Sequence, residues 1–133
     1  MKPSLKPGLA RTRKLTVDES RVIDFMGEDC RVYATPRIIS DVEYTCRNFL
    51  IEHLDPGEDS VGTKVNWEHV GPALLGAEVT ISIKLVSVEG RRVTFEAAVN
   101  DGADAVARGT HERFIVEVQK VRERLLKKKA GRN

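Results

Sequence analysis

Three residues in the central part of the sequence carry side chains that acyl-group chemistry uses, namely Thr35, Glu43 and His69. They provide a hydroxyl, a carboxylate and an imidazole. An imidazole titrates near neutral pH and can take a proton from water or from a hydroxyl, and the activated oxygen can then attack an acyl carbon. The three residues are therefore candidate catalytic residues, and the elements around them must bring them to one substrate.

The element that carries Thr35 and Glu43 is a predicted helix over residues 36–54. Thr35 precedes Pro36, which is typical of an N-cap followed by proline at the first helical position, and Asp55-Pro56-Gly57 ends the helix. Eight helical residues rise about 12 Å, so Thr35 and Glu43 cannot bond directly. They either flank a substrate or belong to sites completed by a second subunit. Apolar residues recur with a helical period at Ile38, Ile39, Val42, Cys46, Phe49, Leu50 and Leu54.

The remaining periodic segments alternate with a period of two and predict strands. In the strand that follows the helix, Val65, Trp67 and His69 share a face, and if this face meets the helix, His69 can approach Glu43. In the last strand we expect Phe114, Val116 and Val118 to be aligned. The predicted strands span residues 8–18, 61–70, 77–88, 91–100 and 105–118, with turns at Glu89-Gly90 and Asp101-Gly102.

This order of elements predicts an α+β protein of the hotdog type, in which a curved antiparallel β-sheet wraps one long central helix. The helix is apolar around most of its circumference, as a wrapped helix must be. The 133 residues suffice for a single domain. We expect a core over about residues 10–120 and a basic C-terminal tail over residues 121–133.

Composition and charge exclude several classes of protein. The net charge of +2 combines basic ends with an acidic body, and no aromatic residues interleave with the basic ones, so we expect no nucleic-acid partner. No apolar run approaches the length of a membrane span, and the N-terminus has no apolar signal region. Cys30 and Cys46 have neither metal spacing nor a disulfide framework. We therefore expect no metal, no cofactor, no membrane partner and a cytoplasmic location.

A set of short motifs at defined spacings resembles the fluoroacetyl-CoA thioesterase family of hotdog proteins. The resemblance runs from about Leu15 to Lys120, nearly the whole domain. The motifs are Tyr33-Ala34-Thr35, Glu43, Leu54-Asp55-Pro56-Gly57-Glu58, Ser60-Val61-Gly62-Thr63, His69, Val88-Glu89-Gly90-Arg91-Arg92 and Gly109-Thr110-His111-Glu112-Arg113.

The resemblance implies a metal-free acyl-CoA thioesterase whose active sites lie near the interface of a homodimer, or of a dimer of dimers. It implies that Thr35, Glu43 and His69 are the catalytic residues and that Gly62 lies close to the substrate, and we expect Thr63 and Trp67 to bind substrate beside it. The fluoroacetate-specific enzyme has a longer, Phe-containing lid before its catalytic Thr. The corresponding segment here, residues 24–33, is shorter. The expected substrate is a small or medium acyl-CoA, and the sequence does not assign its acyl group.

Each candidate also has a structural interpretation. Thr35 can be a helix cap, Glu43 can pair with Arg47 one turn later, and His69 can be a core histidine. Whether Thr35 attacks covalently or positions water is likewise open. Two other functions fit the same residues, a hotdog acyl-CoA hydratase or dehydratase and a non-catalytic acyl-CoA binding module.

Three features outside Thr35, Glu43 and His69 can each be explained without a role in the chemistry. Cys46 is expected to be a core thiol and His111 a structural residue. The run Lys127-Lys128-Lys129 is either a solvated tail or a positive patch that attracts the phosphates of coenzyme A.

Overall fold

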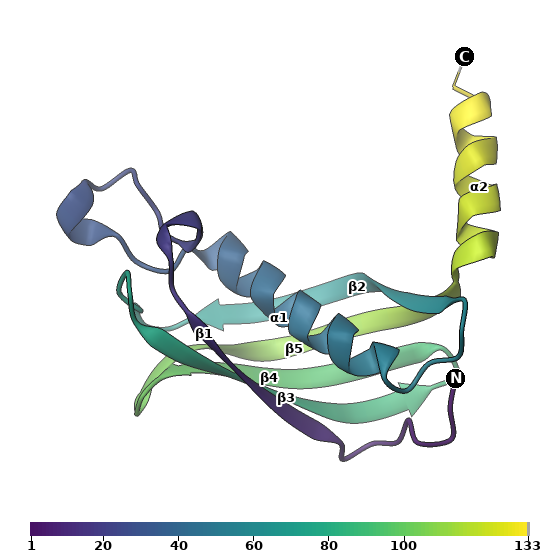
Figure 1. The fold of residues 1–133 in the computed structure, drawn as a ribbon, viewed down its shortest axis with the longest axis horizontal. Coiled ribbons are helices and arrows are strands. Elements are labelled where there is room, and N and C mark those ends of the chain that lie inside the picture. The colour runs from purple at the N-terminus through teal and green to yellow at the C-terminus, as the bar shows by residue number, and fades with distance from the viewer. Residues whose placement is uncertain (133) are drawn as a thin grey trace.

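One long helix lies across a five-stranded antiparallel sheet in the computed structural model, which describes residues 1–132 (Figure 1). The strand order is β1-β3-β4-β5-β2, so β1 and β2 form the two edges. This is the α+β arrangement that the sequence predicts. The elements are β1 (Ala10–Thr16), η1 (Glu19–Arg21), η2 (Glu28–Cys30), α1 (Thr35–Ile51), β2 (Glu58–His69), β3 (Glu78–Glu89), β4 (Arg92–Asp101), β5 (Asp104–Glu117) and α2 (Val118–Ala130).

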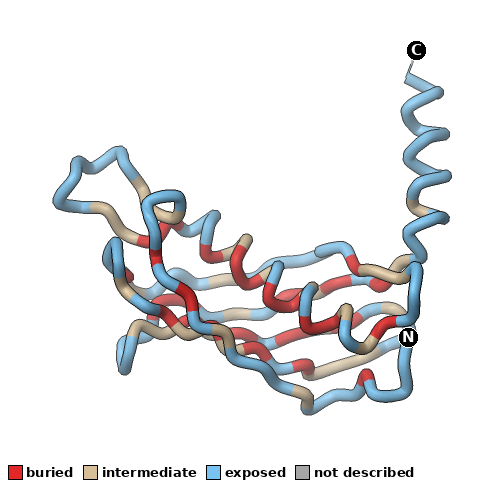
Figure 2. The backbone as a smooth tube through the Cα atoms, viewed as in Figure 1, coloured by how far each residue is buried: buried red, intermediate tan, exposed pale blue. Residues whose placement is uncertain are grey.

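The core fills the space between α1 and the central strands (Figure 2). Alternate residues of β3 and β4 point to the helix, as the period of two in the sequence predicts. Phe49 of α1 meets Phe95 of β4 edge to face, with ring centroids 5.9 Å apart. Burial of each large apolar side chain contributes about 1.5–3 kcal/mol. The buried members of these elements are Ile38, Val42, Cys46, Phe49, Leu50, Val79, Ile81, Ile83, Leu85, Val93, Phe95, Ala97 and Val99.

The boundaries of α1 differ from the prediction at both ends. The helix begins at Thr35, Ala34 is its N-cap, and no side chain bonds to the cap. Thr35 as N-cap was therefore wrong. Ala34 is held in an extended conformation because its N–H bonds to the Arg21 carbonyl at 2.8 Å. At the other end the helix stops at Ile51, three residues early.

The inner face of β5 mixes polar and apolar side chains, because His111 and Arg113 are buried there beside Ala107 and Ile115. The expected alignment of the apolar residues near its end holds only in part. Phe114 and Val116 do share a face, but Phe114 is exposed, and Val118 already belongs to α2. The register with β4 pairs Phe95 with His111. The side chains of His111 and Arg113 are consequently buried under α1, and this places two ionisable groups inside the sheet.

The basic C-terminal segment, which the sequence predicts only as a tail, forms a helix over most of its length. Helix α2 runs from Val118 to Ala130, has no buried residue and stands away from the sheet (Figures 1 and 2). Asn133, the last residue of the predicted tail, lies outside the described residues. Neither α1 nor α2 is long and apolar enough to cross a membrane, and the same holds for every helix of residues 1–132.

Candidate active site

Thr35 and His69 form a hydrogen-bonded pair at the N-terminal end of α1. The Thr35 Oγ1 lies 2.7 Å from Nδ1 of His69, the last residue of β2. With a neutral imidazole protonated on Nε2, the hydroxyl donates this bond and His69 can accept its proton. A hydroxyl held in this way can attack an acyl carbon or hold a water for attack. Both side chains are exposed, so a substrate can reach them.

A buried polar cluster fixes the first turns of α1 beneath this pair. The Tyr33 hydroxyl donates to the Asp41 carboxylate. The same carboxylate accepts from Arg21 Nε at 2.9 Å and from Arg21 Nη2 at 3.2 Å. Burial raises the pKa of the Tyr33 phenol far above its usual value, so this group stays a donor. The cluster ties η1 to α1 and thereby fixes the position of Thr35.

Glu43 lies two turns further along α1 and faces Gly62 of β2. A Cβ added at Gly62 would lie 3.3 Å from Glu43 Oε1 and 3.2 Å from His111 Cε1. The missing side chain therefore leaves space directly above the backbone of β2 and beside the carboxylate. This space lies at an irregularity of β2, because its register with β5 shifts between Gly62 and Lys64.

Arg113 and His111 complete the surroundings of Glu43. Arg113 donates from Nε to Ser60 Oγ at 2.7 Å and from Nη2 to the Ser60 carbonyl at 2.8 Å. His111 donates from Nδ1 to the Lys64 carbonyl at 2.9 Å, which leaves its Nε2 to accept from Arg113 Nη1 at 3.2 Å. These bonds use three of the five guanidinium N–H groups, so two remain for Glu43 or for a ligand.

Burial governs the charge state of both residues. It lowers the pKa of His111, and the neighbouring Arg113 charge lowers it further, so the imidazole is neutral at pH 7. Burial also lowers the pKa of Arg113, while the charge of Glu43 acts in the opposite direction. A guanidinium stays protonated at neutral pH. The result is one buried positive charge placed to face the Glu43 carboxylate or a developing oxyanion.

The proposed structural role of Glu43 as the partner of Arg47 is wrong. Arg47 pairs instead with Asp59 of β2, through Nε at 3.0 Å and Nη2 at 2.6 Å. Among residues 1–132 no cation lies within 4 Å of the Glu43 carboxylate. Glu43 therefore carries a charge that no close ion pair compensates.

A cleft of about 360 Å³ opens beside this carboxylate, which is a volume within the range of small-molecule sites. It lies between α1, β2, the end of β5 and the base of α2. Apolar side chains from β2, β5 and α2 line it together with the polar groups. The lining residues that matter here are Glu43, Tyr44, Ser60, Val61, Arg113 and Val121.

The two predicted substrate-binding side chains of β2 point to different places. Thr63 donates through its hydroxyl to Glu112 Oε2 at 2.8 Å, in an exposed position next to the register shift. Trp67 packs against the core and lies over Gly109, where a Cβ would meet its Cε3 at 2.8 Å. Its indole N–H is buried and has no partner among the described groups.

The structure thus brings Thr35 and His69 together but keeps Glu43 apart from them. His69 ends β2, whereas Gly62, next to Glu43, lies near the start of that strand. The expectation that His69 approaches Glu43 within one chain was wrong, because α1 crosses β2 and reaches its two ends at different turns. One chain consequently holds two half-sites, a hydroxyl–imidazole pair and a carboxylate–guanidinium cleft.

Cys46 and possible metal ligands are the other candidates for chemistry within residues 1–132. Burial raises the pKa of Cys46 to about 12, so it is a neutral core thiol at pH 7. In residues 1–132 no three His, Cys, Asp or Glu side chains are placed to hold a metal ion. The residues that the sequence did not single out are Arg113 and Ser60. Their only signal was their place inside the matched motifs, because their partnership spans 53 positions.

Comparison with known proteins identifies the family of this chain. The model of the family described as fluoroacetyl-CoA-specific thioesterase matches residues 17–119. The fluoroacetyl-CoA thioesterase of Streptantibioticus cattleyicolor is 34% identical over 97 residues, which are 73% of this chain and 70% of that protein.

Solved structures extend the likeness to the fold. A mutant of the fluoroacetyl-CoA-specific thioesterase in complex with fluoroacetate and CoA has a TM-score of 0.81 and 29% identity, covering 88% of this chain and 99% of that one. A hot-dog-like protein from Thermanaerovibrio acidaminovorans has a TM-score of 0.85 and 24% identity, covering 96% and 93%. The predicted hotdog fold is confirmed, and the chain belongs to the fluoroacetyl-CoA-specific thioesterase family.

Proposed function

We propose that this protein is an acyl-CoA thioesterase that hydrolyses a small or medium acyl-CoA to the free acid and coenzyme A. The observation that carries the proposal is the 2.7 Å bond between Thr35 and His69 in a chain of this family. Thioester hydrolysis needs an activated oxygen, a base and a donor for the oxyanion. The pair supplies the first two, and Arg113 has N–H groups free for the third.

The proposed reaction begins when His69 takes a proton from the attacking oxygen, which is that of Thr35 or of a water bonded to it. The oxygen adds to the thioester carbon, and the carbonyl oxygen becomes an oxyanion that accepts from Arg113. The C–S bond then breaks, and the imidazolium returns the proton to the sulfur of coenzyme A. Attack by water releases the free acid in this step. Attack by Thr35 instead leaves the acyl group as an ester on Thr35, and a water activated by His69 must then hydrolyse that ester to give the free acid and restore the hydroxyl. Glu43 orients the attacking water and balances the positive charge that develops on the imidazole.

This chemistry requires that the two half-sites meet, and we propose that they meet in a homodimer. Strand β2 is a 12-residue edge of the sheet, and no described strand pairs with its outer side. Such an edge is a template for pairing with another strand. A two-fold axis near Val65 would pair two β2 strands antiparallel and bring His69 of one subunit to Gly62 of the other. Each of the two resulting sites then contains Thr35 and His69 from one subunit and Glu43 from the other.

The exposure of β2 supports this dimer. The register pairs Val65 and His69 with His111 and Ala107, both of which are buried on the helix side of the sheet. Val65 and His69 face the same side, yet both are exposed in the single chain. The inner face of the edge strand therefore lacks a cover that a second subunit can supply.

A panel of acyl-CoA esters of increasing length tests the function through release of free thiol. We expect turnover with one group of short or medium esters and unchanged activity after dialysis against EDTA, because the proposed reaction uses no metal and no cofactor. Enoyl-CoA hydration without thiol release would identify a hydratase instead. Thermal stabilisation by acyl-CoA without any turnover would identify a binding module.

The proposal also includes a cytoplasmic location. Cys30 and Cys46 are both free thiols, one exposed and one buried. Reducing compartments preserve such unpaired cysteines.

A further inference from the structure

Helix α2 carries an apolar stripe, and none of its residues is buried by the rest of residues 1–132. Val118, Val121 and Leu125 recur at a helical spacing, with Leu126 beside the last of them. The Leu125 side chain is 60% exposed. A helix of 13 residues is marginal when isolated in water. The attachment of α2 to the body is its first turn, where the Val118 N–H bonds to the Gly57 carbonyl at 2.9 Å.

A second unpartnered apolar surface lies at the opposite end of the molecule. It comprises the loop of residues 24–30, which contains η2, and the segment that follows β2. Phe25 is 77% exposed and Leu74 is 63% exposed. The loop is tied to this segment by the bridge between Val32 and Leu74 and by the bond from the Leu75 N–H to the Arg31 carbonyl at 3.2 Å.

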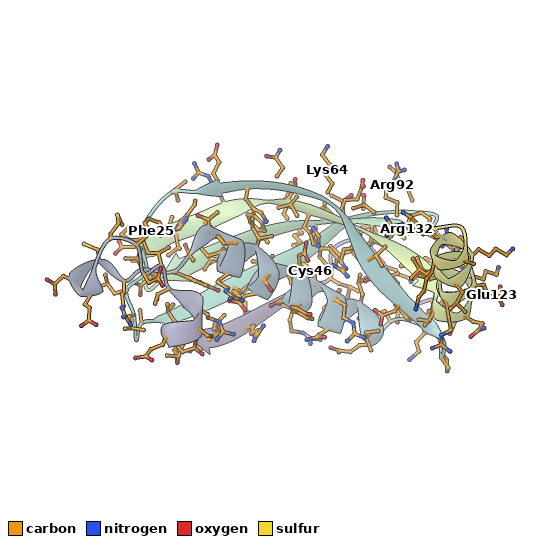
Figure 3. All side chains as sticks on the ribbon, turned by 90° about the horizontal axis from the view of Figure 1, so that it is seen from above. Phe25, Cys46, Lys64, Arg92, Glu123 and Arg132 are labelled. Carbon is orange, nitrogen blue, oxygen red and sulfur yellow. The ribbon has the colours of Figure 1, made fainter. Side chains whose placement is uncertain are left out.

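The two surfaces are complementary in charge. Residues 24–30 contain three acidic residues and no basic one, whereas α2 contains six Lys or Arg residues and one Glu. Both elements rise from the same side of the sheet, one at each end (Figure 1). Seen from above, the labelled Phe25 and Glu123 mark these two ends, with Cys46 between them (Figure 3). They cannot meet within one chain.

We propose that in the homodimer the apolar stripe of α2 packs against the loop of residues 24–30 and Leu74 of the partner subunit. This inference rests on the proposed pairing of two β2 strands. That pairing is antiparallel, so the start of β2 lies beside the residues that follow His69 in the partner. Helix α2 is fixed at Gly57, just before β2, and the loop is fixed at Leu74, just after it. The two-fold axis therefore places the helix of one subunit next to the loop of the other.

The contact has a consequence for the active site. The base of α2 forms a wall of the Glu43 cleft through Val121, and the loop precedes Thr35 in the sequence. A helix that packs on the partner's loop would hold that loop over the site to which the partner contributes Thr35 and His69. The C-terminal segment then belongs to the enclosure of the substrate and is not a free tail.

Native Cys30 makes the contact directly testable, because it is an exposed thiol within the loop. In Leu125→Cys, mild oxidation at micromolar protein should give a covalent dimer. Neighbouring thiols in one complex have an effective concentration on the order of millimolar, so this reaction should outrun random crosslinking by orders of magnitude. Adding Cys30→Ser should abolish the dimer band, and Lys84→Cys on the outer face of β3 should not produce it. Arg122→Cys is a second probe in case Leu125→Cys weakens the packing.

The outcomes separate the contact from the proposed function. A chain that is dimeric by light scattering and releases thiol from acyl-CoA, but does not crosslink through either cysteine, would overturn the contact and leave the thioesterase intact. A monomeric chain would overturn both the dimer and the contact. Flotation with phosphatidylglycerol vesicles that depends on residues 119–133, without crosslinking, would assign α2 to a lipid surface and reject the proposal.

Discussion

The hydroxyl of Thr35 and Nδ1 of His69 are 2.7 Å apart, although the two residues are separated by 34 positions and lie on different elements. Thr35 is the first residue of α1 and His69 is the last residue of β2. The pair is therefore set by the angle at which α1 crosses the sheet. This angle in turn depends on the cluster of Arg21, Tyr33 and Asp41 that holds the first turns of the helix.

Replacement of His69 tests the base. His69→Ala should lower kcat for thioester hydrolysis by about two to four orders of magnitude, the usual effect of removing a general base. The thermal midpoint should change little, because His69 is exposed. His53→Ala is the matched control and should keep wild-type turnover, because this half-buried histidine is bonded to Ser4 and lies at the other end of α1 from Thr35. Near-normal turnover in a folded His69→Ala protein would return His69 to a structural role.

Replacement of Glu43 tests the carboxylate. Glu43→Gln keeps the shape and hydrogen-bonding capacity but removes the charge, so kcat should fall while the thermal midpoint holds or rises. The reason is that Arg47 pairs with Asp59, so no close ion pair is broken, and the Glu43 side chain is only half-buried. Glu52→Gln, at the exposed C-cap of the helix, is the control and should keep wild-type kcat. Its ion pair with Arg11 is exposed, so the thermal midpoint should change little. A collapse in stability with unchanged activity per folded molecule would make Glu43 a structural residue.

Local patterns predicted most of the fold. Strands β3 and β4 were placed to within one residue because Val93, Phe95, Ala97 and Val99 alternate strictly and the Glu89-Gly90 turn separates them. The start of α1 was misplaced for a physical reason. A threonine before proline is typical of a cap, but here its hydroxyl bonds to a histidine from a distant strand, and such long-range bonds leave no local signal.

The sequence predicted which residues belong to the candidate site, but it did not predict which of them lie close together. Hydroxyl, carboxylate and imidazole were identifiable by type and by family resemblance, whereas the separation of Glu43 from His69 depends on how α1 crosses β2. The buried Arg113 was not predicted, because strands usually bury apolar residues and its stabilising acceptors on Ser60 come from another strand. Only a three-dimensional arrangement shows that three of its N–H groups have acceptors.

Replacement of Gly62 tests the space above β2. In Gly62→Ala the new methyl group would lie 3.2 Å from His111 Cε1 and 3.3 Å from Glu43 Oε1, so these groups must move by a few tenths of an ångström. We expect kcat/KM to fall by roughly ten- to a hundredfold, because catalytic groups tolerate little displacement. Glu68→Ala, on the outer face of the same strand, is the control. Unchanged kcat/KM in Gly62→Ala would show that the substrate does not use this space.

The buried His111 should make stability depend on pH. Burial and the Arg113 charge lower its pKa in the folded state below 6.5, so below that pH the unfolded chain binds a proton that the folded chain does not. The free energy of unfolding should therefore be fully retained above pH 6.5 and decrease as the pH falls below it, by at most about 1.4 kcal/mol per pH unit. Denaturant titrations between pH 5 and 8 measure this slope. His111→Gln should flatten it and His53→Gln should not; equal slopes in the wild type and His111→Gln would contradict the assignment.

The positive end of α2 should attract the substrate without taking part in the chemistry. Lys127, Lys128 and Lys129 lie beyond Leu126, the last residue of the apolar stripe, and coenzyme A is polyanionic. Replacing all three lysines by glutamine keeps the helix and should raise KM at low salt while kcat stays constant, which is the pattern of lost uniform binding. The difference should shrink near physiological ionic strength, where the Debye length is about 8 Å. Neutralising Lys84 and Arg108, which lie on the strands, controls for net charge, and light scattering must show the same dimer content in each protein. If KM at low salt is the same in the triple variant and the wild type, the lysines are a solvated surface with no role in recruiting the substrate.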